Sequence, residues 1–260
     1  MISYCIACYR PRYARELIEE LIRKTSVPFE ILLWLNVADA EFDQFLCEKE
    51  VSGAPLRIIG RTPENIGMAA YLKLFAESRF DMVTQIDDDV VCLSPGIAEI
   101  AHETFSRFRN VSMLTADVWQ DEYTTGARPP MGHYRVVSSE CGLYDGPIDG
   151  WFAVYRKSSL LRLCPLIPSA RYICIGSLIK NLLRRIGSRG LLCTRMKVFH
   201  VIGPEYASYF GMLGFEIEKY KSLGREELVQ WYSDARDKIP PHSELHQRVL
   251  KIHASLSGNV

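Results

Sequence analysis

The alternation of short apolar segments with longer amphipathic ones is the feature of this sequence that most restricts its fold. In the N-terminal third, several apolar segments have the length and residue types of buried strands: 3–9, 29–35, 56–60 and 82–86. Helical patterns separate them, beginning at Pro11 and then covering 39–50 and 65–78. Continuous apolar strands joined through helices predict an α/β fold, with a mostly parallel sheet that helices cover on both faces.

The remainder of the chain continues this alternation less regularly. We expect further strands at 111–116, 150–156 and 196–203, and helices from Pro95 to about 107 and over 177–187. Residues 117–149 are rich in Gly, Pro, Tyr and charge, which predicts a long loop with a hairpin near 133–137. Helical patterns fill most of 205–255. We therefore predict one α/β domain over 1–203 and a helical C-terminal extension over 204–260 that packs on it.

Composition argues against several classes of protein. The chain of 260 residues carries 31 basic and 31 acidic residues, and this neutral balance argues against a dedicated nucleic-acid-binding protein. No apolar run reaches the roughly 18 residues that a membrane span needs, and the N-terminus lacks the features of a signal peptide. The 8 cysteines are scattered, and Cys5 and Cys8 lie three apart in an expected strand, where they point to opposite faces. We interpret them as buried thiols and expect a cytoplasmic protein.

Three adjacent aspartates, Asp87, Asp88 and Asp89, directly follow the apolar segment 82–86. Adjacent carboxylates repel one another, so they need a cation, a tight hydrogen-bonding loop or full solvation. In α/β sheets, ligands bind beyond the carboxyl ends of the strands, where these residues are expected to lie. Alternate residues of a strand end share a face, so Asp87 and Asp89 can point together while Asp88 points elsewhere. The alternative is a solvated acidic turn before the helix that follows Pro95.

Segments in a fixed order resemble a GT-A nucleotide-sugar glycosyltransferase of the family 2 type: "SYCIACYRPR" (3–12), "EILLWLNVAD" (30–39), "ENIGMAAYLKLF" (64–75) and "QIDDDVVCLSPG" (85–96). The last segment is similar to the metal-binding D-x-D stretch of that family, and the resemblance extends over roughly 3–203. It implies that a nucleotide-sugar donor contacts the following residues: Tyr9, Arg10, Asn36, Asn65, Asp87 and Asp88. It further implies that Asp89 ligates a metal most directly, while Asp87 contacts the ribose or a metal-bound water.

The resemblance also implies a divalent cation, Mn²⁺ or Mg²⁺, as cofactor. Such a cation offsets the negative charge of a departing diphosphate, and both ions prefer oxygen ligands. His200, at the end of "KVFH", matches a further metal ligand of the family, so the implied ligands are Asp87, Asp89 and His200. A lone histidine after an apolar strand also suits a core or surface position. Other histidines share one helical pattern and compete for a metal-binding role: His242, His246 and His253.

The acceptor side of the resemblance rests on "IDGWFAVYRK" (148–157). Gly150 would let the backbone approach a ligand, and Trp151 either stacks on a sugar or packs in the core. An inverting transferase needs a carboxylate base, which the family takes from a Glu-Asp pair opening the next helix. The helix expected at 172–183 opens without an acid. Three explanations stay open: a base from elsewhere, a retaining mechanism, or an impaired enzyme. The candidate bases are Asp149 first, then Asp145, Glu140 and Glu205.

We therefore expect a metal-dependent glycosyltransferase that moves a sugar from a UDP- or GDP-sugar to a saccharide or lipid-linked acceptor. Two alternatives stay open: a non-catalytic homologue that binds a sugar nucleotide or a partner protein, and a nucleotidyltransferase. The latter is disfavoured because no Gly-rich, Lys-containing loop follows the first strand. The basic amphipathic segment 177–187 is compatible with a helix on the inner face of a membrane, and also with a helix that packs on the core.

Overall fold

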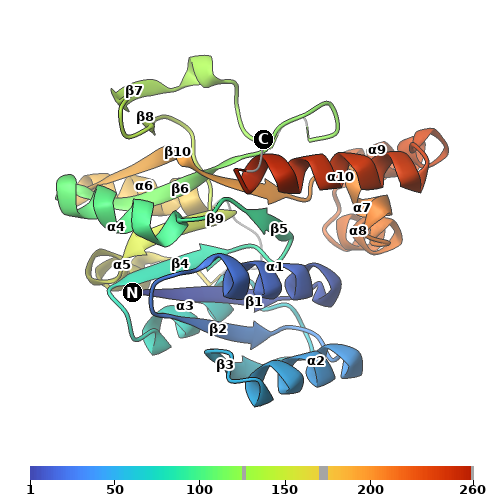
Figure 1. Cartoon of the computed structure of the whole chain (residues 1–260), viewed down its shortest axis with the longest axis horizontal. Helices are drawn as coiled ribbons and strands as arrows, with labels where there is room; N and C mark the ends of the chain where they lie inside the picture. The colour runs from blue at the N-terminus through green and yellow to red at the C-terminus, as the bar shows by residue number, and fades with distance from the viewer. Residues whose placement is uncertain (125–126, 170–174, 259–260) are drawn as a thin grey trace.

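The structure, a computed structural model, describes residues 1–124, 127–169 and 175–258 (Figure 1). Its strands are β1 (Ile2–Cys8), β2 (Phe29–Leu35), β3 (Leu56–Arg61), β4 (Met82–Ile86), β5 (Val90–Leu93), β6 (Val111–Val118), β7 (Arg135–Ser138), β8 (Leu143–Asp145), β9 (Phe152–Arg156) and β10 (Arg189–His200). The α-helices are α1 (Pro11–Lys24), α2 (Ala40–Val51), α3 (Met68–Glu77), α4 (Ile97–Arg107), α5 (Lys157–Leu163), α6 (Ile175–Arg185), α7 (Pro204–Tyr209), α8 (Leu213–Ser222), α9 (Glu226–Ala235) and α10 (His242–Leu256). Short 3₁₀ helices are η1 (Met131–His133), η2 (Cys164–Leu166) and η3 (Arg236–Lys238).

All the strands join one mixed sheet. β1 pairs in parallel with β2 and β4, and β2 pairs in parallel with β3. β9 lies antiparallel between β4 and β6, while β10 runs parallel to β6. β5 and β8 each pair antiparallel with β10, and β7 pairs antiparallel with β8. The predicted α/β sheet flanked by helices is therefore confirmed, with its longest ladders parallel.

The strands β5 and β10 differ from the sequence-based expectation. β5 was not expected, because its four residues are too short for a clear pattern and follow directly on the turn in which Val90 N–H donates to the Asp87 carbonyl at 3.1 Å. β10 begins at Arg189 instead of residue 196. Its pairing with β6 shifts register between Cys193 and Lys197, and this irregularity interrupts the apolar pattern.

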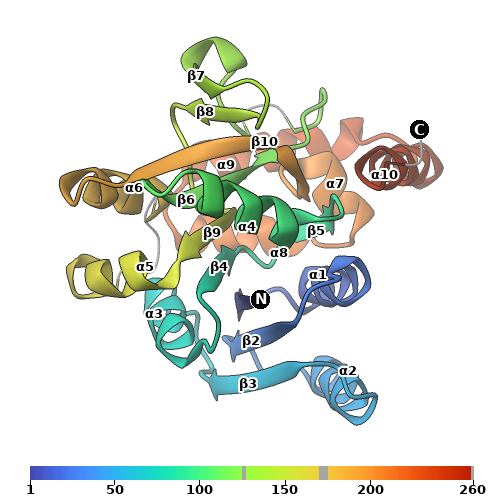
Figure 2. The same cartoon turned by 60° about the vertical axis from the view of Figure 1, so that its left-hand side comes forward.

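The sheet separates two hydrophobic cores, as Figure 2 shows by the helices on either face. α1, α2 and α4 pack on one face, with Leu17 and Phe42 among the buried side chains. α3, α5 and α6 pack on the other face, with Leu74 among them. Burying each such side chain contributes roughly 2 kcal/mol. Cys8 lies in the first core and Cys5 in the second, both as free buried thiols, so the prediction that they point to opposite faces is confirmed.

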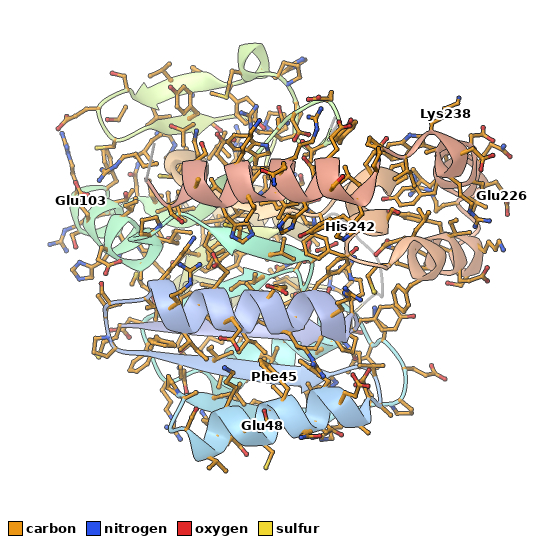
Figure 3. All side chains as sticks on the ribbon, turned by 45° about the vertical axis from the view of Figure 1, so that its right-hand side comes forward. Phe45, Glu48, Glu103, Glu226, Lys238 and His242 are labelled. Carbon is orange, nitrogen blue, oxygen red and sulfur yellow. The ribbon has the colours of Figure 1, made fainter. Side chains whose placement is uncertain are left out.

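The C-terminal helices share a core with the sheet. Tyr13 of α1 and Phe199 of β10 are buried together with Tyr206 of α7, with Phe210 directly after α7, and with Ile252 of α10. Figure 3, which labels His242 at the start of α10, shows this helix running across the molecule beside α1. α8 and α9 lie at one end of the molecule (Figure 1). The domain boundary at residue 203 stays a prediction.

The basic amphipathic helix is α6, and its apolar stripe faces the core. Ile179 and Leu182 are buried there, and the Lys180 ammonium donates to Asp145 at 2.8 Å. The predicted start of this helix at 172–174 lies outside the described residues. The apolar side chains that would have to contact a membrane are therefore packed in the protein core. Within the described parts of the chain, every helix is too short or too polar to cross a bilayer.

Candidate functional site

A cavity of about 360 Å³ opens at the carboxyl ends of β1 and β4, the edge at which the sequence placed a site. Several elements far apart in the sequence form its walls. They contribute Tyr9 and Arg10 after β1, Asn65 and Tyr71 at α3, the three aspartates after β4, Ile175 of α6, His200 of β10, and Lys219, Tyr220 and Leu223 at α8. The cavity is therefore built from both the sheet and the C-terminal helices.

Asp87, Asp89 and His200 lie together in the cavity wall, and we name them the cavity cluster. One ligand atom from each lies within 4.8 Å of the others. His200 arrives because β10 pairs with β5, which sets His200 opposite Val90. Its Nε2 lies 2.9 Å from Asp89 Oδ1, and its buried Nδ1 has no hydrogen-bond partner among the described residues. Two carboxylates and an imidazole suit a divalent cation, so the residues present fit the implied Mn²⁺ or Mg²⁺.

Asp88 points away from this cluster, as strand alternation predicts. Its Oδ2 accepts the backbone N–H groups of Tyr9 and Arg10, each at 2.6 Å. Its Oδ1 accepts Nε and Nη2 of the Arg10 guanidinium at 2.8 and 2.6 Å. The central aspartate therefore has a hydrogen-bonded loop as its partner, while its neighbours face the cavity. One of the physical conditions that the sequence raised, a tight hydrogen-bonding loop, is therefore met for Asp88.

Arg10 is a buried cation shared by several acids. Besides Asp88, its guanidinium lies 2.5 Å from Asp89 Oδ2 and 3.2 Å from Glu216 Oε1 of α8. Arg10 therefore lines the cavity, but its guanidinium is directed to protein carboxylates. This arrangement suits a residue that positions the loop after β1 and ties α8 to it.

The protonation of the cavity cluster is strongly coupled. Burial and the neighbouring Asp89 carboxylate raise the pKa of Asp87 to about 7. Burial also acts to raise the pKa of Asp89, but Arg10 and His200 outweigh it and hold that pKa below its usual range. Burial opposes a charged His200, yet the Asp89 carboxylate raises the pKa of this imidazole above its ordinary value. The raised pKa values of Asp87 and His200 thus both reflect the negative charge of the neighbouring Asp89 carboxylate.

The other residues implied in donor binding divide into two groups. Tyr9 and Asn65 line the cavity; the Tyr9 ring packs against Phe215 at 5.2 Å, and Asn65 Oδ1 accepts the Gly67 N–H at 2.8 Å. Asn36 is buried, and its Oδ1 accepts the Ile66 N–H at 3.2 Å. Asn36 does not belong to the described cavity lining. It instead holds the loop that leads into α3.

The acceptor-side residues are packed more tightly than the sequence indicated. Trp151 is 7% exposed and donates from Nε1 to the Ala116 carbonyl at 2.8 Å, which supports its interpretation as a core residue. A Cβ on Gly150 would lie 2.4 Å from Gln85 Nε2, so Gly150 packs closely against the Gln85 side chain. Asp149 Oδ1 accepts the N–H of Gly150 at 2.8 Å and that of Gly176 in α6 at 3.0 Å.

Asp149 also lies outside the described lining of the cavity, although its charge contributes to the raised pKa of Asp87. The other candidate bases have partners of their own. Asp145 pairs with Lys180, and Glu140 pairs with Arg107. The burial of Glu205 raises its pKa, but the described cavity lining does not include it. Asp149 therefore stays the first candidate, through an oxygen other than Oδ1.

The competing histidines do not gather in one place. His242 and His246 stack on Tyr209, with ring centroids 4.9 and 6.1 Å from it. His253 instead lies beside Glu20 and Cys92. Among the described residues, these three histidines form no common cluster of metal ligands.

Sequence reasoning missed the contribution of α8 and of Gln85. Lys219 and Tyr220 of α8, and Leu223 directly after it, line the cavity, and no motif in that segment signals it. Gln85 also lines the cavity. The alternation that grouped Asp87 with Asp89 extends back to Gln85, so strand periodicity is a signal that could have found it.

No protein-family model matches this chain, and no curated protein sequence matches it. Solved structures do match. S. aureus TarS 1–349 in complex with UDP-GlcNAc has 13% identity and a TM-score of 0.59, over 80% of this chain and 60% of the TarS 1–349 chain. The mannosyltransferase PcManGT from Pyrobaculum calidifontis, in complex with GDP-Man and Mn²⁺, has 14% identity and a TM-score of 0.60, over 93% and 66%. GalNAc-T7 with UDP, GalNAc and Mn²⁺ has 11% identity and a TM-score of 0.61, over 98% and 57%.

This chain therefore spans 57% to 66% of the length of these three chains. At such low identities, the similarity shows a shared fold. The chain has the GT-A fold of nucleotide-sugar glycosyltransferases, as the resemblance of its motifs implied.

Proposed function

We propose that this chain, which has the GT-A fold, is a metal-dependent glycosyltransferase that moves a sugar from a UDP- or GDP-sugar to a saccharide or lipid-linked acceptor. One observation carries the proposal: the ligand atoms of Asp87, Asp89 and His200 lie within 4.8 Å of one another in the wall of a cavity at the carboxyl ends of the strands. Structurally similar proteins support the substrate class, since they were solved with UDP-GlcNAc, with GDP-Man and Mn²⁺, and with UDP, GalNAc and Mn²⁺.

The chemistry that this site would perform follows from its charges. A divalent cation on the cavity cluster would offset the negative charge that develops on the leaving diphosphate. Asp88 and Arg10 hold the loop that carries Tyr9 against the cavity, which orients whatever occupies it. The half-buried setting reduces solvent screening, so charges there act on a substrate more strongly than they would in water.

Transfer with inversion also requires a proton acceptor for the acceptor hydroxyl. We assign this role to Asp149, because its side chain accepts the N–H of Gly176, which adjoins Ile175 of the cavity wall. Asp149→Asn is expected to slow sugar transfer by about 10²- to 10⁴-fold with little change in donor affinity. Asp145→Asn is the matched control, since Asp145 pairs with Lys180 outside the cavity. Equal transfer rates in Asp149→Asn and the wild type would assign the base to another residue.

The second candidate function is a non-catalytic protein that binds a sugar nucleotide. It is favoured by the first turn of α6, which has no acidic residue where the related fold commonly supplies a base. Such a protein would bind a donor with metal and release neither sugar nor nucleotide. Turnover of the bound donor, measured as free nucleoside diphosphate, separates the two functions.

Isothermal titration tests the proposal itself. The purified protein is titrated with UDP, GDP, CDP and dTDP, each with and without Mn²⁺. We expect one of UDP and GDP to bind in a Mn²⁺-dependent manner, which also identifies the donor nucleotide. Absence of binding for all four nucleotides would contradict the proposed function.

A further inference from the structure

The helix α8, which belongs to the C-terminal part of the chain, forms part of the cavity wall. It contributes Lys219 and Tyr220, and Leu223 follows at its end. Among the described lining residues, the Lys and Arg side chains are Arg10 and Lys219. These two cations differ in the partners that hold them.

Arg10 is fully engaged by protein carboxylates. Its guanidinium contacts Asp88, Asp89 and Glu216. Lys219, by contrast, contacts the single carboxylate of Glu216, three residues earlier in α8. Its ammonium also lies 4.4 Å from the Tyr220 ring, a weaker interaction. Lys219 is therefore the cation that an incoming anion can recruit at the smaller cost.

Lys219 also lines the same cavity as the cavity cluster. Its positive charge acts on the Asp89 carboxylate of that cluster. An anion held by a metal at Asp89 would therefore lie within reach of this flexible side chain. Tyr220, which follows Lys219, lines the same wall.

The balance of charge around the cavity indicates a role for Lys219. The carboxylates of Asp87, Asp88, Asp89 and Glu216 face the two cations Arg10 and Lys219. A divalent cation would bring this set close to neutrality. A nucleoside diphosphate then adds negative charge again, and Lys219 is the remaining positive group that can exchange Glu216 for phosphate oxygens.

We propose that Lys219 binds the diphosphate of the donor, so that the C-terminal helix α8 completes the donor site. This inference rests on the proposed function and assigns a residue outside the segments that resemble the family. Glu216 holds Lys219 in place before the donor arrives and ties it, through Arg10, to the loop after β1.

Titration of UDP and GDP in the presence of Mn²⁺ tests the assignment in three variants. Lys219→Met is expected to bind the diphosphate about 10- to 100-fold more weakly than the wild type, the range for losing a hydrogen bond to a charged group. Lys219→Arg retains the charge and is expected to stay within about threefold of the wild type. Lys221→Met is the matched control on the same helix, because Lys221 is 52% exposed and pairs with Glu218.

Binding of Mn²⁺ alone separates a direct contact from a structural defect. Removing a nearby positive charge leaves Mn²⁺ affinity unchanged or slightly higher, whereas a distorted site would bind Mn²⁺ more weakly. Diphosphate binding by Lys219→Met that equals the wild type overturns this inference and leaves the proposed function intact. If the wild type shows no Mn²⁺-dependent binding of UDP or GDP, that result contradicts both the proposed function and this inference.

Discussion

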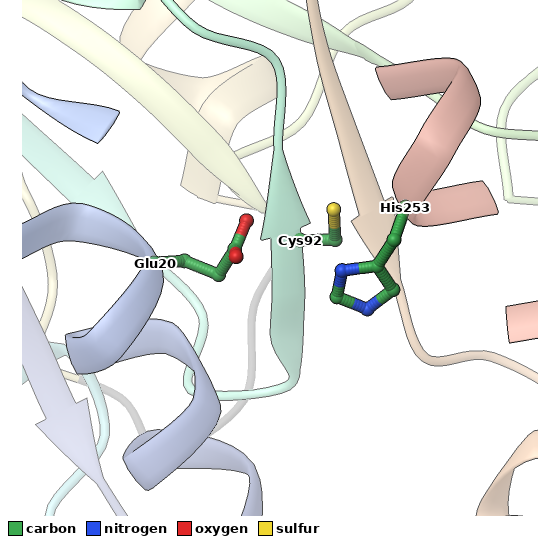
Figure 4. Close-up of side chains that lie close together, drawn as sticks. All are labelled: Glu20, Cys92 and His253. Atoms are coloured by element: carbon green, nitrogen blue, oxygen red, sulfur yellow. The ribbon is translucent and has the colours of Figure 1, made fainter. Parts of the chain in front are cut away.

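Two clusters in this molecule present similar metal-binding side chains, yet their surroundings differ. The cavity cluster contains Asp87, Asp89 and His200. A second set, which we name the flank cluster, contains Glu20 of α1, Cys92 of β5 and His253 of α10 (Figure 4). In each cluster, the possible ligand atoms lie within 4.8 Å of one another. Ligand chemistry and spacing alone therefore do not distinguish the two.

The difference lies in the charges that surround each cluster. In the flank cluster, the Lys24 ammonium lies 2.8 Å from Glu20 Oε2 and 3.7 Å from Cys92 Sγ, and it also donates to the Leu93 carbonyl. Arg23 pairs with the other oxygen of Glu20. One carboxylate thus has two cations, so the protein's own ammonium occupies the place that a metal would take.

The cavity cluster has the opposite balance and an open side. Its carboxylates outnumber the cations that contact them, and it faces a cavity of about 360 Å³. The pKa values of the histidines in the two clusters are shifted in opposite directions. Asp89 raises the pKa of His200 against the effect of burial, whereas burial, Lys24 and Arg23 lower the pKa of His253. Excess negative charge and the adjoining cavity, more than the list of ligands, favour the cavity cluster as the proposed metal site.

The largest effect is expected from Asp89→Asn. Replacing a charged ligand by a neutral one should weaken Mn²⁺-dependent binding of the nucleoside diphosphate by at least about a thousandfold, or about 4 kcal/mol. Isothermal titration with and without Mn²⁺ measures it, and thermal unfolding verifies that the variant folds. His253→Gln in the flank cluster is the control and should bind as the wild type does. Unchanged metal-dependent binding in Asp89→Asn would remove the metal assignment.

A smaller effect, on stability, is expected from Lys24→Met. Glu20 is buried and would lose its buried cation, with only the largely exposed Arg23 left to pair with it, so the free energy of unfolding should fall by about 3 kcal/mol. Urea denaturation measures this change. Lys49→Met is the control, because Lys49 pairs with the half-exposed Glu19 and should cost less than about 1 kcal/mol.

The same variant, Lys24→Met, tests whether the Lys24 ammonium excludes a metal from the flank cluster. Without the Lys24 ammonium, the flank cluster offers a carboxylate, a thiol and an imidazole to Zn²⁺. We expect Zn²⁺ to raise the melting temperature of Lys24→Met and to leave that of the wild type unchanged. Equal stabilisation of both proteins would show that the internal cation does not exclude a metal.

The smallest effect concerns pH. Burial and the cations of α1 lower the pKa of His253 in the folded protein. At pH values below about 6.5, the ordinary pKa of histidine, the unfolded chain therefore binds more protons than the folded protein does. The free energy of unfolding should therefore fall as pH decreases through about 6.5. In His253→Gln this decrease should be smaller, as measured by urea denaturation between about pH 7.5 and 5.5. Identical slopes in both proteins would indicate that His253 titrates as it does in water.

Sequence patterns predicted the parts of the fold that short-range interactions determine. β2 at 29–35 and β4 at 82–86 have the predicted bounds, because their apolar runs end at turn or charged residues. Asp87 and Asp89 were grouped for the same reason, since alternation along a strand is local. β5 was missed because four residues carry too little pattern, and its partner β10 follows about a hundred residues later.

The site required more than local signals. His200 was identified from the order of elements, and it reaches Asp89 through the pairing of β10 with β5. Lys219 carried no signal, because its place in the cavity depends on how α8 packs at the loop after β1 through Glu216 and Arg10. The roles of Trp151 and Gly150 also depended on their neighbours, the Ala116 carbonyl and the Gln85 side chain.

The sequence by itself determined the α/β class, the order of most strands and helices, and the paired carboxylates at the end of β4. These features follow from periodicity and from the repulsion between adjacent charges, both of which act over a few residues. Only the tertiary structure decided which of two similar clusters faces a cavity, where Lys24 and Arg10 place their charges, and that α8 closes the site. Coulomb interactions act through space, so their balance is set by residues that the fold brings together from distant parts of the chain.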